Sequence, residues 1–257
     1  NLGGGRAIVT FPKEVSGWAA LTLRGLSAGD EVTVRYDESL KPGGTVTDPY
    51  VPGPWRPMTD NDRSIDRFFQ QTRSQNFRGA ASGMQTDHFI SAGGAVESPE
   101  PRFVWHGFRH LIVDGLKTPL EPGDAKAKLV RTAFAETGTF TCSNPILNDL
   151  VEHARQSYRC NFTCGYPTDC PHREKNGWMA DAAMAVEFGL LDYGMAADYR
   201  KWLQDIMDAQ RPSGMIPAIV PTCGWGSFIF DGCGYGPVWD SAPYAVVHGL
   251  WRHCGDT

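Results

Sequence analysis

The stretch from Pro167 to Asp181, PTDCPHREKNGWMAD, interrupts regular structure and concentrates chemically reactive side chains. Within fifteen positions it holds three carboxylates, one arginine, one histidine and one tryptophan. Two prolines and a glycine disfavour a continuous helix or strand there. Such a composition is unfavourable for a hydrophobic core, so we expect a functional site. The stretch lies in a segment of helical periodicity, which follows a segment of strand periodicity.

The segment before the stretch shows the two-residue alternation of β-strands. Apolar and polar residues alternate over Ala19–Leu23 and Val32–Tyr36, with a turn at Leu26–Asp30 between them. Alternation separated by turn signals is typical of antiparallel sheets with one solvated face, so we predict a β-sandwich domain over residues 1–135. Further strands are predicted at Gln85–Ala92, Arg102–Trp105, Phe108–Asp114 and Ala125–Phe134.

A less regular region lies between these strands. Four prolines over Asp48–Pro57 predict an extended loop. Apolar residues at helical spacing over Asp60–Gln75 predict a short inserted helix. Its arginines alternate with aspartates, which favours a solvated face over a phosphate-binding site.

Residues 136–257 follow the 3.6-residue period of helices and are predicted to form a second domain. Asn144 is expected to cap a helix that begins at Pro145. Its apolar stripe is predicted to contain Ile146, Leu147, Leu150, Val151, Ala154 and Tyr158. A second helix is predicted over Trp178–Leu191, with Ala182, Ala185 and Phe188 facing inward. A third is predicted over Met195–Gln210, where the buried residues are Tyr199, Trp202, Leu203, Ile206 and Met207. A fourth is predicted to begin after Asp240, its N-cap, and to continue toward Trp251. The connection Ser213–Trp239 is long and rich in glycine, proline and aromatic residues, as functional loops are.

Composition excludes several classes of protein. The chain has 257 residues, a net charge of -5 and a pI of about 5.8, without the basic face that nucleic acids and anionic membranes require. Its apolar runs are much shorter than the ~18 residues of a membrane span. The N-terminus Asn1-Leu2-Gly3 has neither an initiator methionine nor a signal-like segment, so we expect it to be processed or cut.

All seven cysteines lie in the second half of the chain. An odd, clustered set is not a disulfide framework of the kind that small secreted domains use. Cys160, Cys164, Cys170 and His172 lie close in sequence, but the short Cys-x2-Cys pairs of structural zinc sites are missing. We therefore predict buried free cysteines and no metal site.

The carboxylates of the central stretch indicate acid–base chemistry. Glu174 and Asp181 are seven residues apart and would share a face of a helix that begins early, while Asp169 lies in a proline-bounded loop. Carboxylates that converge on one cleft repel each other when both are ionised, so their pKa values move apart. One of them then remains protonated and can act as a general acid. Trp178 offers an apolar surface on which a sugar ring packs. Each residue alone also has a simpler interpretation: Asp169 as a loop cap, Glu174 as part of a solvated helix turn, and Asp181 as a surface acid. The cluster as a whole favours a site.

Three histidines have a structural interpretation. His106 and His110 belong to strand ends, and His172 lies between a proline and an arginine. We interpret all three as scaffold residues, with a hydrogen bond to substrate as the alternative role for His172.

The central stretch closely resembles the signature of bacterial α-L-rhamnosidases of glycoside hydrolase family 78. The segments 106–110 (HGFRH), 37–40 (DESL), 85–87 (QTD) and 237–242 (PVWDSA) also match that family, in the family's order, as does Gly17-Trp18. The resemblance therefore covers nearly the whole chain.

The resemblance implies an inverting hydrolase that releases terminal α-linked L-rhamnose in an (α/α)6 barrel, of which this chain holds only the first helical hairpins. It implies that Glu174 is the general acid. Many members carry two adjacent acids where this chain has Glu174-Lys175, so this role falls on Glu174 alone. The implied substrate contacts are Asp169, Arg173, Trp178, Asp181, Trp225, Trp239 and Asp240. Inversion needs a second carboxylate as base, which the family supplies from later in the barrel, beyond Thr257.

The implied partner is a glycan or glycoside that contains L-rhamnose, with no cofactor, nucleic acid or membrane insertion. The resemblance favours a periplasmic or extracellular location, with a cytoplasmic one left open. Two alternatives remain at this point. One is a carbohydrate-binding or scaffold fragment without catalysis, and the other is a different (α/α)6 carbohydrate enzyme.

Overall fold

The computed structural model describes residues 1–41, 45–46, 85–172, 175–221 and 236–256. These residues form two compact units. The sheet unit contains the described residues up to Val130 together with Pro171 and His172. The helical unit contains Arg131–Cys170 and the described residues from Lys175 onward.

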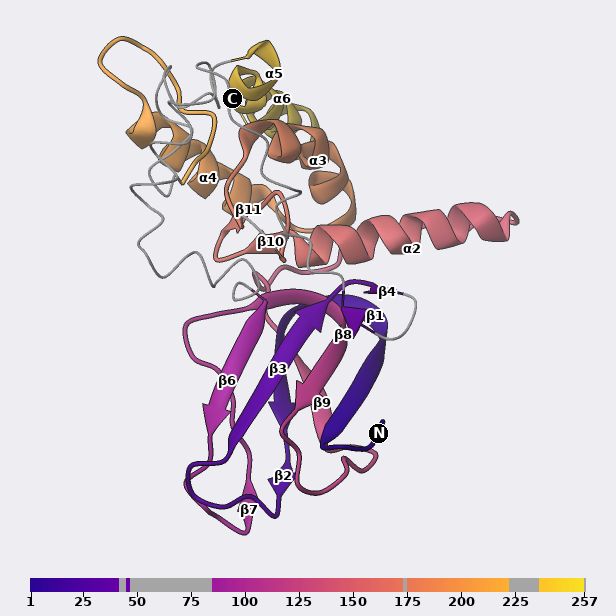
Figure 1. Ribbon diagram of the computed structural model, residues 1–257. Helices are drawn as coiled ribbons and strands as arrows, with labels where there is room; N and C mark the ends of the chain where they lie inside the picture. Colours follow the sequence, from indigo (N-terminus) through magenta and orange to yellow (C-terminus); the bar gives the residue numbers. More distant parts are fainter. Residues whose placement is uncertain (42–44, 47–84, 173–174, 222–235, 257) are drawn as a thin grey trace, which may run out of the picture. The chain divides into compact units, whose positions relative to one another are not determined.

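The sheet unit is built on a five-stranded antiparallel sheet with the order β6-β3-β8-β1-β9 (Figure 1). Its strands are β1 (Arg6–Leu21), β3 (Glu31–Asp37), β6 (Thr86–Ile90), β8 (His106–Asp114) and β9 (Ala125–Leu129). The pairing of β1 with β8 is irregular between Thr10 and Val15. The predicted antiparallel architecture is confirmed.

Short ladders accompany this sheet. Strand β2 (Leu23–Arg24) pairs with β7 (Val96–Glu97), and β4 (Leu40–Lys41) pairs with β5 (Thr45–Val46). The main sheet buries the apolar face that the alternation predicts, since Val34 and Leu111 are fully enclosed.

A polar network lies inside the sheet unit. The ring of His106 stacks on Tyr36 at 4.0 Å between centroids, and its Nε2 lies 3.1 Å from Asp87 Oδ1. The hydroxyl of Tyr36 donates to the other oxygen of Asp87 at 2.7 Å. The Gln85 side chain meets His106 Nδ1 at 3.1 Å. Gln85 and Asp87 of the motif QTD and His106 of the motif HGFRH thus satisfy one another in the core, as buried polar groups must.

Two strand predictions were wrong. The backbone over Arg102–Trp105 forms no strand, because Phe103 has a φ of 63° and its side chain projects fully into solvent. The strand predicted over Ala125–Phe134 ends at Leu129. The predicted loop at Asp48–Pro57 and helix at Asp60–Gln75 lie outside the described residues.

The helical unit contains five described helices and one small hairpin. The helices are α2 (Pro145–Cys160), α3 (Met179–Asp192), α4 (Ala196–Ala209), α5 (Pro237–Asp240) and α6 (Ala242–Cys254), and the hairpin joins β10 (Phe162–Thr163) to β11 (Tyr166–Pro167). Within the part of the chain that the structure describes, no helix is long and apolar enough to cross a membrane.

Local chemistry sets the start of α2. The side chain of Asn144 accepts a hydrogen bond from the Ile146 amide at 3.0 Å, and Pro145 occupies the first helical position, as predicted. The predicted stripe, however, is not buried along its length. Ile146 and Leu150 are 73% and 61% exposed, and Figure 1 shows the first turns of α2 extending beyond the other helices of the unit.

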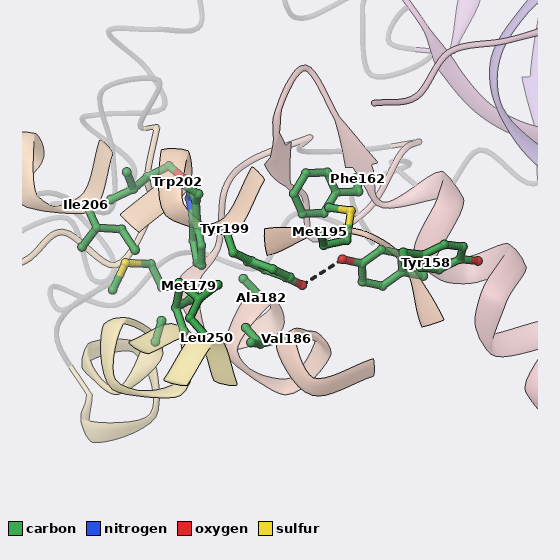
Figure 2. Close-up of a cluster of buried hydrophobic side chains, with 14 residues drawn as sticks. Tyr158, Phe162, Met179, Ala182, Val186, Met195, Tyr199, Trp202, Ile206 and Leu250 are labelled. Carbon is green, nitrogen blue, oxygen red and sulfur yellow. Dashed lines mark hydrogen bonds between the residues drawn. The ribbon is translucent and has the colours of Figure 1, made fainter. Parts of the chain in front are cut away.

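Helices α3, α4 and α6 enclose the core of the helical unit (Figure 2). Tyr199, Trp202 and Ile206 of α4 are buried as predicted, and Leu203 is partly buried against them. Met207 is 51% exposed, because it lies beyond the edge of the buried stripe. On α3, Ala182 is fully buried while Ala185 and Phe188 pack partly buried against the core.

The predicted N-cap at Asp240 was also wrong. Asp240 is the last residue of α5, and Ser241 occupies the N-cap position of α6. The chain makes one short helical turn before α6, and a sequence pattern does not separate such a turn from the longer helix.

A buried tyrosine pair fixes the packing of α3 against α2 and α4. The hydroxyls of Tyr158 and Tyr199 are 2.8 Å apart, as the dashed line in Figure 2 marks. Gly189 of α3 faces them, and a Cβ at this position would lie 2.1 Å from the Tyr158 oxygen. The pair therefore requires glycine at position 189.

We expect Gly189→Ala to destabilise the protein by about 2 kcal/mol in denaturant unfolding, because the new methyl group overpacks the core. Alanine is otherwise better than glycine in a helix by about 1 kcal/mol, so a loss of stability isolates the clash. Adding Tyr158→Phe should recover part of the loss. The control is Gly194→Ala, whose Cβ would meet nothing closer than 3.7 Å. Strict additivity of the two core substitutions would contradict this packing.

Candidate active site

The central stretch forms a loop whose two ends are hydrogen-bonded to each other. The Asn176 amide donates to Asp169 Oδ1 at 2.9 Å, and the Asp169 amide donates to the Asn176 carbonyl at 3.0 Å. The Cys170 thiol donates to the second oxygen of Asp169 at 3.1 Å. Asp169 therefore closes the loop, as the simpler sequence interpretation allowed, and its carboxylate has a fixed orientation.

The loop is also attached to the end of α2. The amide and the hydroxyl of Thr168 both donate to the carbonyl of Asn161, at 2.7 and 3.2 Å. The Tyr166 hydroxyl donates to the Lys175 carbonyl at 3.3 Å. These bonds fix the entry of the loop relative to α2.

The exit of the loop pairs with residues before the long connection. Trp178 forms an isolated antiparallel bridge with Ile219. The Val220 amide donates to the Gly177 carbonyl at 2.8 Å, and the Met179 amide donates to the Ala218 carbonyl at 3.0 Å. Helix α3 then begins at Met179, so its first turn is anchored on the fully buried residues 218–220.

Asp169 and Asp181 line one pocket of about 310 Å³. Asp181 lies in the first turn of α3, where the helix dipole favours a negative charge. The polar lining is completed by Ser157, Asn161 and Thr168. The apolar lining consists of Ala154, Tyr158, Phe162, Pro167, Ala182, Ala185 and Phe188. Two carboxylates that are twelve residues apart in sequence therefore face the same small volume.

Tyr158 contributes an uncharged aromatic side chain to this lining. Burial, together with the neighbouring Tyr199, raises the pKa of the Tyr158 phenol far above its ordinary value. The phenol therefore remains neutral and bonds to Tyr199. Ionisable chemistry in the described part of the pocket rests on Asp169 and Asp181.

A second group of predicted residues gathers at the start of α3. The rings of Trp178 and Trp239 meet edge to face, with 6.2 Å between centroids. Trp239 and Asp240 belong to α5, which packs against α3. Among the described residues, neither Trp239 Nε1 nor Asp240 Oδ1 has a hydrogen-bond partner, although both atoms are shielded from solvent. A buried donor and a buried acceptor without partners are uncommon in folded proteins.

Three predicted site residues, Arg173, Glu174 and Trp225, lie outside the described residues. The idea that Glu174 and Asp181 share a helix face was wrong, because α3 begins only at Met179. The structure thus brings Asp169 and Asp181 together, and separately Trp178, Trp239 and Asp240.

Some pocket residues escaped sequence reasoning. Ser157 and Asn161 reach the pocket from the last turn of α2 and its end. The only feature of the sequence that could have indicated their role is that both are polar and lie next to the apolar stripe of α2. Among the described residues, no three histidine, cysteine, aspartate or glutamate side chains are arranged to hold a metal ion.

Comparison with known families covers both units. Residues 1–131 match the model of the bacterial alpha-L-rhamnosidase concanavalin-like domain. Residues 135–257 match the model of the bacterial alpha-L-rhamnosidase 6 hairpin glycosidase domain. The β domain followed by a six-hairpin helical domain is the predicted fold class.

Individual relatives give the same result. An alpha-L-rhamnosidase of Formosa agariphila is 32% identical over 210 residues, which is 81% of this chain and 19% of that protein. One of Streptomyces avermitilis is 28% identical over 231 residues, which is 89% of this chain and 19% of that protein. This chain thus spans about a fifth of the length of these curated relatives.

Solved structures agree with the fold. The alpha-L-rhamnosidase from Dictyoglumus thermophilum has a TM-score of 0.77 at 27% identity, covering 96% of this chain and 24% of that one. The Streptomyces avermitilis enzyme complexed with L-rhamnose has a TM-score of 0.77 at 26% identity, covering 98% of this chain and 21% of that one. With family models that match both units, the chain belongs to the bacterial α-L-rhamnosidase family.

Proposed function

We propose that this chain is the β domain and the first part of the catalytic domain of an inverting α-L-rhamnosidase, with the domains divided between residues 135 and 136. The observation that carries the proposal is the shared pocket of Asp169 and Asp181, which lies at the loop with the family signature. Sugar sites combine carboxylates, which accept hydrogen bonds from hydroxyl groups, with aromatic and apolar surfaces. The pocket has both components.

The proposed roles are those that the resemblance to the family implies for each residue. Glu174 protonates the leaving oxygen, and Arg173 orients a carboxylate or a hydroxyl. Asp169 and Asp181 accept hydrogen bonds from rhamnose hydroxyls. Trp178 packs on the apolar face of the sugar, while Trp239 and Asp240 line the same cleft, together with Trp225, which is assigned by its place in the long connection Ser213–Trp239. No residue of this chain is assigned as the base.

The pocket also bears on the choice of sugar. Ala182, Ala185 and Phe188 form one apolar wall on α3. L-rhamnose is a 6-deoxy sugar, so it carries a methyl group where L-mannose carries a hydroxymethyl group. An apolar wall accepts the methyl group without desolvating a hydroxyl, which favours the deoxy sugar.

The test is hydrolysis by the complete enzyme that contains this chain. We expect turnover of an aryl α-L-rhamnoside with a kcat/KM at least about tenfold above that of the matched α-L-mannoside. Proton NMR should show β-L-rhamnose as the first product, as inversion requires. The aryl α-L-fucoside, a 6-deoxy sugar with different hydroxyl orientations, is the matched control. Equal rates on all three substrates, or α-L-rhamnose as the first product, would contradict the proposal.

A further inference from the structure

Three titratable side chains meet within the sheet unit. His172 Nδ1 lies 2.6 Å from Glu38 Oε1, and these side chains are only 20% and 34% exposed. Glu14 forms a hydrogen bond with Glu38 from the irregular part of β1. Glu38 directly follows β3, so three segments far apart in sequence build this Glu14–Glu38–His172 cluster.

The cluster shares protons. Burial, and then the charge of Glu38, raise the pKa of Glu14 to about 7. Burial opposes ionisation of Glu38 too, but the hydrogen bond from His172 and its charge hold the pKa of Glu38 below its ordinary value. Below neutral pH a protonated Glu14 therefore donates to an ionised Glu38, which in turn accepts from His172.

The backbone beside His172 is fitted closely to the sheet. A Cβ at Gly107 of β8 would lie 2.7 Å from Pro171 Cγ and 2.8 Å from the His172 nitrogen. The Gly107 carbonyl also accepts a bond from Gln85 Nε2 at 2.6 Å. This contact requires glycine at position 107 and leaves Pro171 and His172 little freedom.

We propose that Glu14 and Glu38 are positioning residues that hold His172 through a chain of hydrogen bonds, and that the chemistry of the signature loop depends on this hold. The inference rests on the proposed function of Glu174 as the general acid. The charged groups that act on Glu14 are Glu38 and His172. When Glu14 loses its proton, two carboxylates oppose each other and the hold on His172 weakens.

The variants are Glu38→Gln and Glu14→Gln, with Glu31→Gln as the matched control. Glu31 also pairs with a histidine on the sheet unit, His88 at 2.9 Å, but both side chains are more than half exposed. At pH 6.5, Glu38→Gln should speed hydrogen exchange of the amides of residues 169–178 by about tenfold, and Glu31→Gln should not. Glu14→Gln keeps a neutral donor to Glu38, so it should keep slow exchange to a higher pH than the wild type.

In the complete enzyme, Glu38→Gln should lower kcat by about tenfold with little change in KM, because a displaced acid affects the transition state. Glu38→Asp should restore part of kcat. Glu14→Gln should move the alkaline limb of the kcat–pH profile upward. The inference is overturned if amide hydrogen exchange of residues 169–178 is the same in Glu38→Gln as in the wild type. It is also overturned if Glu38→Gln lowers the melting temperature but leaves kcat and its pH profile at wild-type values. If the wild type does not hydrolyse rhamnosides, the proposed function fails, and the exchange result alone decides whether the cluster anchors the loop.

Discussion

Glu174→Gln in the complete enzyme should lower kcat by about 10³-fold on an alkyl α-L-rhamnoside, whose alkoxide is a poor leaving group. A general acid acts on the departing oxygen, so its loss matters most where that oxygen needs a proton. With a dinitrophenyl leaving group, which departs as a stable anion, we expect a loss of about tenfold or less. The dependence on the leaving group identifies the acid better than the loss alone.

The control for this measurement is Glu187→Gln. Glu187 is an exposed glutamate on α3 that pairs with Arg252 at 3.1 Å, so its substitution removes a carboxylate of the helical unit outside the pocket. It should leave kcat within about twofold of the wild type, as expected for an exposed ion pair. Equal losses with both leaving groups in Glu174→Gln would show that this residue acts on something other than the leaving oxygen.

The sequence predicted those features of the fold that depend on neighbouring residues. Asn144 and Pro145 place the start of α2 correctly, because a side-chain cap and a fixed φ act within one turn. The same reasoning failed at Phe103, whose positive φ interrupts an apparent strand, and at Asp240, where two helices adjoin. Periodicity identified the apolar face of α2, but it carries no information on what covers Ile146 or Leu150.

The site was predictable in part for a similar reason. Asp169, Trp178 and Asp181 are close in sequence, so a local motif revealed them together. Trp239 came from a second motif, and the structure shows its ring against Trp178.

Other contacts could not be predicted. Neither Ser157 nor Asn161 belongs to a motif. The Glu14–Glu38–His172 cluster depends on long-range pairing, since its members come from three segments far apart in sequence.

Gly177→Ala should produce the largest loss of stability of the substitutions considered. A Cβ at Gly177 would lie 2.0 Å from the Val220 carbonyl oxygen and 2.6 Å from its carbon. Both are backbone atoms, so no rotation of a side chain relieves the overlap. The Val220 segment must move, and the hydrogen bond from the Val220 amide to the Gly177 carbonyl is lost with it.

That movement has a second cost, because the Val220 carbonyl also accepts a bond from the buried Trp202 Nε1 at 2.8 Å. Overpacking and the loss of these bonds together should destabilise the helical unit by about 3 kcal/mol in denaturant unfolding. Tryptophan fluorescence, to which the buried Trp202 contributes, should report the same transition. Gly194→Ala, with an open position for the added methyl group, should change stability by less than about 0.5 kcal/mol. Equal stability of the two variants would show that the bridge between Trp178 and Ile219 does not hold the start of α3. The expected difference makes Gly177 the residue that joins the signature loop to the core of the helical unit.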